Sequence, residues 1–117
     1  MRTHLLLALA ASAAVLLAQP APEAWAVPTF ESLGVYYNQA APAKAPCTIR
    51  YRAAGASDWR DGYPLVYDAR EHQYRGSLVL LKPDTAYEIR LEAGSSHAEF
   101  QARSSGDERL TPVWLIR

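Results

Sequence analysis

The chain has 117 residues, half of them hydrophobic, and its 12 Lys and Arg residues balance 12 Asp and Glu residues. Because a neutral chain has no net field to attract nucleic acid or an anionic membrane surface, we expect neither as a partner. Cys47 is the only cysteine, which excludes an intramolecular disulfide and a cysteine-based zinc site. This length supports one domain with a modest core and excludes a large enzyme.

The N-terminal segment has the pattern of a signal peptide. Arg2 and His4 precede an uncharged apolar run at residues 5–18, which is shorter than the roughly 18 residues of a membrane-spanning helix. Residues 24–26, Ala-Trp-Ala, give the small-x-small pattern of a cleavage site, so we expect residues 1–26 to be removed before Val27. Ala18 and Ala21 are alternative sites. The mature protein is expected to be secreted or periplasmic, with no membrane attachment.

The mature segment, residues 27–103, is predicted to be all-β. Extended runs at residues 30–37, 47–52, 63–67, 74–81, 87–93 and 97–103 are bounded by turn-forming residues. No window has the spacing of an amphipathic helix, so we expect no helix there. Six or seven short strands at this spacing indicate a two-sheet antiparallel sandwich, with an Ala- and Pro-rich loop at residues 39–46. Residues 104–117 are interpreted as a tail or linker.

Three of the runs alternate strictly between apolar and polar residues. Residues 87–93 place Tyr87, Ile89 and Leu91 on one face, and residues 97–103 follow after a Gly-Ser-Ser turn, which predicts a hairpin. In residues 47–52, Arg50 and Arg52 face away from the apolar side. We expect these arginines to pair across strands with the outward carboxylates of residues 87–93.

The run that ends at Leu81 leads into Leu-Lys-Pro-Asp-Thr-Ala-Tyr, residues 81–87. This stretch resembles the Leu-x-Pro-Gly-Thr-x-Tyr signature of fibronectin type III domains. The resemblance implies an immunoglobulin-like sandwich with a tyrosine corner, in which Leu81 fills the core, Pro83 shapes the turn and the Tyr87 hydroxyl bonds to backbone upstream. Asp84 stands where the family has glycine, a change that turn geometry tolerates.

The resemblance covers about residues 28–103, with two departures. The core tryptophan that the family carries in its second strand is replaced by Tyr36 or Tyr37, and the predicted cleavage before Val27 leaves little room for a first strand. Residues 28–37 and 74–91 are also similar to a small fibronectin-like domain at the N-terminus of some secreted bacterial proteins. That similarity implies an accessory module rather than an independent enzyme.

Residues that would indicate catalysis or metal binding are missing from the sequence. It contains no glycine-rich phosphate loop, no Gly-x-Ser-x-Gly and no His-Glu-x-x-His motif. Glu71 and His72 lack an orienting group or a nucleophile, and His97 has no second ligand at metal-binding spacing. Cys47 fits a small buried hydrophobe, with intermolecular pairing as the alternative. We therefore predict no enzyme activity, no cofactor and no metal.

The most distinctive surface candidate is aromatic. Trp59, Tyr63, Tyr67 and Tyr74 are interspersed with charged residues, a composition that suits stacking on a sugar or contact with a protein. The competing interpretation is that these rings only cover a sheet edge. The sequence thus predicts an exported, non-catalytic accessory or interaction module that binds a protein domain or a polysaccharide. The alternative is a small carbohydrate-binding domain that uses the aromatic residues.

Overall fold

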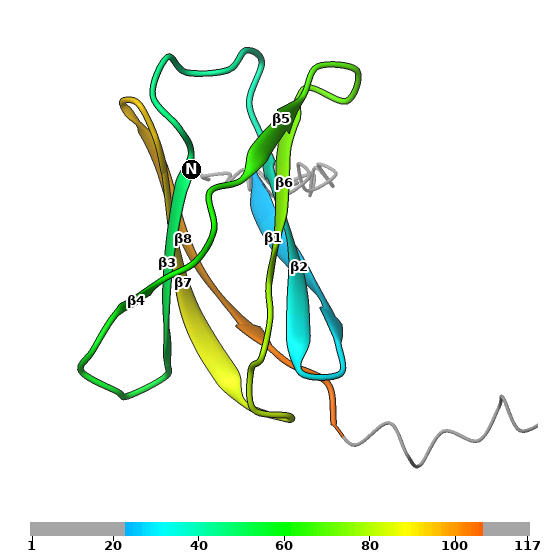
Figure 1. Ribbon diagram of the computed structural model, residues 1–117, viewed down its shortest axis with the longest axis vertical. Coiled ribbons are helices and arrows are strands. Elements are labelled where there is room, and N and C mark those ends of the chain that lie inside the picture. The colour runs from blue at the N-terminus through cyan, green and yellow to red at the C-terminus, as the bar shows by residue number, and fades with distance from the viewer. Residues whose placement is uncertain (1–22, 107–117) are drawn as a thin grey trace, which may run out of the picture.

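The computed structural model describes residues 23–106, which form two antiparallel four-stranded sheets packed face to face (Figure 1). One sheet has the order β1-β2-β6-β5 and the other β4-β3-β7-β8. The strands are β1 Ala24–Thr29, β2 Ser32–Asn38, β3 Thr48–Ala53, β4 Arg60–Asp61, β5 Val66–Asp68, β6 Gln73–Leu78, β7 Ala86–Ala93 and β8 Ser96–Arg103. The all-β sandwich predicted from the sequence is confirmed. Residues 1–22, with most of the predicted signal peptide, and 107–117 of the predicted tail lie outside the described residues.

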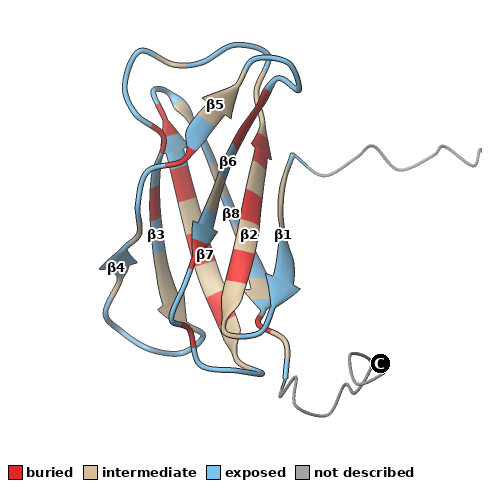
Figure 2. Ribbon diagram, turned by 45° about the vertical axis from the view of Figure 1, so that its right-hand side comes forward, coloured by how far each residue is buried: buried red, intermediate tan, exposed pale blue. Residues whose placement is uncertain are grey.

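Alternation in the sequence identified the central strands because each buries one face only. Leu33, Val35 and Tyr37 of β2 are fully buried, and so are Ile89 and Leu91 of β7, which face them across the sandwich. Figure 2 shows buried positions alternating with less buried ones along both strands. The expected hairpin is formed by β7 and β8, which pair over their whole length. Burial of the alternate apolar residues is the main stabilising contribution of such a core.

Cys47 lies in the core, immediately before β3. It is fully buried, and an isolated bridge pairs it with Leu65, which is also buried. Burial raises the pKa of its thiol to about 11, because the thiolate would have to form away from water. Within the domain Cys47 is therefore a small hydrophobic residue.

The first strand departs from the sequence-based expectation. β1 begins at Ala24, and its first half pairs with β2, with Ala24 opposite Tyr37 and Ala26 opposite Val35. Trp25 stacks on Tyr36 with ring centroids 5.5 Å apart. Both alanines pack against the core. Alternating small residues fit a half-buried strand as well as a peptidase site, so the Ala-x-Ala spacing has two meanings here.

The turn between β6 and β7 is closed by hydrogen bonds at residues 81–87. The Tyr87 hydroxyl accepts a hydrogen bond from the backbone N–H of Lys82 at 2.9 Å, and the Leu81 N–H donates to the carbonyl of Glu31 at 2.9 Å. Buried Ser104 donates its hydroxyl to the Lys82 carbonyl at 2.6 Å. Asp84 has a φ of 49°, the left-handed conformation that glycine adopts most readily. We call this feature the corner.

Within residues 23–106 the structure contains strands and turns but no helix, as the sequence predicts. No helix in this part of the chain is long and apolar enough to cross a membrane.

Candidate functional site

The four aromatic residues singled out in the sequence do not form one surface. Tyr74 of β6 is buried, and its hydroxyl accepts a hydrogen bond from the Ala43 N–H at 2.7 Å. Tyr67 of β5 is its Cα partner, meets it edge to face at 5.0 Å and donates to the Gln39 carbonyl at 2.8 Å. Because paired residues of neighbouring strands point to the same face, both rings turn inward and hold the loop at residues 39–46. Neither contributes to an exposed aromatic surface.

Trp59 lies on the outside of the other sheet, where its ring contacts two arginines. The guanidinium carbons of Arg52 and Arg90 lie 4.3 and 4.2 Å from the ring centroid. A guanidinium over an indole face is attracted by the negative face of the ring. The arginines come from β3 and β7, so Trp59 ties the segment before β4 to the middle of the sheet. Its ring is therefore engaged by its own chain rather than open to a ligand.

The charged residues around Trp59 also pair with one another. Arg52 and Glu88 are Cα partners on β3 and β7, and Arg52 Nε lies 2.8 Å from the Glu88 carboxylate, as expected from the alternation. Arg90 lies 3.0 Å from the carboxylate of Glu99 on β8. Arg50 pairs with Asp61 of β4 at 3.5 Å. We call this set the charged face, and its pairing matches a solvated structural surface.

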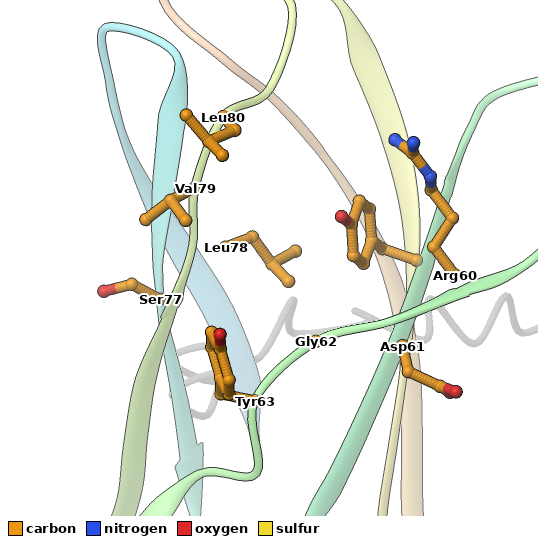
Figure 3. Close-up of a pocket in the computed structure, with 9 residues that line it drawn as sticks. Arg60, Asp61, Gly62, Tyr63, Ser77, Leu78, Val79 and Leu80 are labelled. Carbon is orange, nitrogen blue, oxygen red and sulfur yellow. The ribbon is translucent and has the colours of Figure 1, made fainter.

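A different surface lies at the side of the sandwich, where the chain crosses from β4 to β5. A pocket of about 480 Å³ opens there between the two sheets (Figure 3). Gly62 and Tyr63 form one side and the residues from Ser77 to Leu80 form the other. A Cβ on Gly62 would lie 2.9 Å from the Leu78 side chain. Glycine at this position therefore lets the crossing segment approach the core and form the pocket floor.

Apolar side chains surround this pocket and face the solvent. Tyr63 is 82% exposed, Leu80 is 89% exposed and Val79 is 49% exposed. Leu80 has a φ of 59°, an unusual backbone conformation for a bulky residue. We call these three residues, with the pocket between them, the edge surface. Large apolar side chains gathered around a concave site mark interaction surfaces more often than isolated ones do.

The backbone beside the pocket is also uncovered. β5 pairs with β6 only at residues 73–75. Along residues 76–78, β6 therefore has a strand neighbour only on the β2 side among the described residues. A free strand edge offers backbone donors and acceptors to an added strand.

The sequence-based search found Tyr63 but not Val79 or Leu80. Residues 78–81 read Leu-Val-Leu-Leu at the end of the β6 run. Leu78 and Leu81 are both buried, so the two residues between them are turned outward. Four consecutive apolar residues cannot all face one core from a one-sided strand, and that conflict was the available signal.

The structure brings no catalytic or metal-binding set together in its described part. Residues 23–106 contain no group of three or more His, Cys, Asp or Glu side chains placed to hold a metal. Glu71 and His72 line a polar hollow together with Glu23 and Asn38. Asp68 has a lowered pKa because the backbone N–H of Arg70 donates to its carboxylate, a turn-stabilising contact.

The edge surface and the charged face are thus the two candidates for function. Only the edge surface leaves its aromatic and apolar side chains unengaged by the described part of the chain. In the comparisons with known proteins, no family model and no curated protein matches this sequence.

Proposed function

We propose that the chain is an exported, non-catalytic accessory module of the fibronectin type III type that docks a protein segment at the edge surface. The observation that carries this proposal is the exposure of Tyr63, Val79 and Leu80 around a pocket of about 480 Å³ beside a free strand edge. Exposed apolar groups in a concave site gain the most from losing contact with water. The free edge adds backbone hydrogen bonds that an extended partner can form.

Two further observations support the fibronectin type III assignment. The strand orders agree with immunoglobulin-like sandwiches, in which the first, second, fourth and fifth strands share a sheet, if the two-residue β4 is set aside. The hydrogen bond from the Lys82 N–H to the Tyr87 hydroxyl has the geometry of a tyrosine corner. The positive φ of Asp84 explains why the family signature has glycine there.

The carbohydrate-binding alternative has less support in the geometry. Stacking on a sugar needs an open ring face, and Trp59 already contacts two guanidinium groups. Tyr67 and Tyr74 face inward, which leaves Tyr63 as the one largely open ring of the four. A single tyrosine beside Val79 and Leu80 fits a protein side chain better than a polar sugar. In a glycan-array screen the full chain should therefore show no binding.

Photo-crosslinking tests the docking role directly. The full chain is expressed in a host that exports it, with the photoreactive residue benzoylphenylalanine replacing Tyr63. We expect one discrete protein adduct or an internal crosslink, and we expect Leu80→Asp to abolish it. The matched control places the same probe at Val27, which is also exposed but lies on β1. Absence of any crosslink at position 63, or an equal yield at position 27, would contradict the proposal.

The position of the mature N-terminus tests the export part of the proposal. Cleavage before Val27 would remove Ala24, Trp25 and Ala26, which pair with β2. The two upstream sites, Ala18 and Ala21, leave β1 complete, so β1 favours them. N-terminal sequencing of exported protein should yield a chain that retains Trp25. Exported protein that keeps Met1 would refute processing, and exported protein that starts at Val27 would show that β1 is shortened.

A further inference from the structure

We infer that the edge surface is covered by the chain's own segment 110–117, which adds in an extended conformation along the free edge of β6. The inference rests on the proposed docking role and names its occupant. The segment reads Leu-Thr-Pro-Val-Trp-Leu-Ile-Arg, with large apolar side chains at five of its eight positions. An apolar segment and an apolar surface of the same chain gain by removing each other from water.

The described chain ends beside the edge surface. Ser105 forms a bridge with Phe30, and its carbonyl accepts a hydrogen bond from the Asp84 N–H at 2.9 Å. The neighbouring Glu31 accepts from the Leu81 N–H at 2.9 Å. Residues 81–84 and the exit of the chain therefore flank the same turn between β1 and β2. Figure 1 shows the end of β8 and the end of β6 at the same end of the sandwich.

The length and composition of the following residues match the distance to be covered. Residues 107–109 are Asp-Glu-Arg, and three extended residues span about 10 Å. These charged residues are long enough to pass from Gly106 to the level of Leu80. Eight extended residues after them span about 26 Å, whereas the uncovered stretch at residues 76–80 spans about 17 Å.

The direction of the chain also fits strand addition. β6 runs toward the end of the sandwich where the chain leaves, so a segment that starts at Leu80 and follows the free edge runs antiparallel to β6. Antiparallel strands form the pairing seen throughout both sheets. Pro112 is tolerated because proline occurs on edge strands, where one side needs no backbone donor. Trp114 then lies near the far end of the pocket, toward Tyr63.

The backbone of Leu80 gives an independent reason for an occupant. A leucine with a φ of 59° and 89% of its surface exposed has both an unfavourable backbone and an unburied side chain. Contact with an apolar segment would offset both costs. The chain's own segment has an advantage over a separate partner, because a short tether gives it a high effective concentration.

Fluorescence of Trp114 in the full chain tests the inference. Trp25→Phe and Trp59→Phe leave Trp114 as the single tryptophan. We expect acrylamide to quench Trp114 several-fold less in the folded protein than in denaturant, at every protein concentration. Leu80→Asp should raise quenching to the denatured level, whereas Val27→Asp, a matched change at another exposed apolar residue, should leave it unchanged. If the double substitution impairs folding, 5-fluorotryptophan in the otherwise natural chain gives the same measurement, with Trp114→Phe assigning its resonance.

The outcomes separate this inference from the docking role. Protection of Trp114 that appears only at high protein concentration would assign the surface to a second copy and overturn the inference. Full exposure of Trp114, with Tyr63 still crosslinking to another protein, would overturn the inference and leave the docking role standing. Full exposure without any crosslink at position 63 would overturn both. Protection that Leu80→Asp does not affect would place the segment elsewhere and also contradict the inference.

Discussion

The corner and the edge surface meet between two consecutive leucines that behave in opposite ways. Leu81 is 4% exposed and joins the core, whereas Leu80 is 89% exposed and lies beside the pocket. Around Leu81, Tyr87 and Ser104 satisfy the backbone of the turn. Around Leu80, the described chain leaves both apolar side chains and a strand edge uncovered. A surface whose groups already have partners points to stability, and one whose groups lack them points to binding.

The first prediction compares these two leucines by alanine substitution. Leu81→Ala should lower the free energy of unfolding by about 2–5 kcal/mol, because it leaves a cavity in the core. Leu80→Ala should cost about 1 kcal/mol or less, since removing an exposed side chain opens no cavity. Urea denaturation of both full-length variants and of the natural chain measures the difference. Similar losses for the two variants would show that the edge is part of the core.

The second prediction compares the two aromatic residues that lie outside the core. Trp59→Ala should lower the free energy of unfolding by about 1–3 kcal/mol, because it removes two guanidinium contacts of about 0.5–1 kcal/mol each and part of a ring packed on the sheet. Tyr63→Ala should cost less than about 0.5 kcal/mol in an 82% exposed position. The measurement is again a denaturant titration. A stable Trp59→Ala variant that loses a glycan ligand would restore the carbohydrate-binding alternative.

The third prediction tests the hydrogen bond of the corner. Tyr87→Phe keeps the ring but leaves the Lys82 N–H without its acceptor, which should cost about 1–2 kcal/mol. Tyr63→Phe is the control, since the hydroxyl of an exposed ring already bonds to water and its loss should be neutral. Thermal melting of the three proteins compares them. A melting temperature unchanged by Tyr87→Phe would remove the energetic support for a tyrosine corner.

The smallest effect on stability at neutral pH is expected from the buried thiol. Burial raises the pKa of Cys47 from 9.0 to about 11, so the folded state retains the proton that the unfolded state loses first. This contribution to stability is complete below pH 9 and is lost as the pH rises from 9 toward about 11. At pH 8 a thiol reagent should react with Cys47 only at the rate at which the protein unfolds. Rapid labelling of the native protein would show that Cys47 is accessible.

The sequence alone determined the parts of the fold that depend on local patterns. Strict alternation located β3, β7 and β8, because a strand that buries one face must alternate polar and apolar residues. The residues from Leu81 to Tyr87 marked the turn between sheets, because its chemistry is carried by neighbours in the chain. The burial of Cys47 followed from the same alternation.

The tertiary structure decided which of the remaining apolar and aromatic residues face outward. Tyr67 and Tyr74 turned inward because β5 pairs with β6 beneath the loop at residues 39–46. Trp59 was engaged by arginines from two strands that only the sheet brings together. The edge surface arose because β5 is short and leaves part of β6 uncovered. These outcomes depend on which strands become neighbours, and a one-dimensional pattern of polarity does not specify neighbours that are distant in the chain.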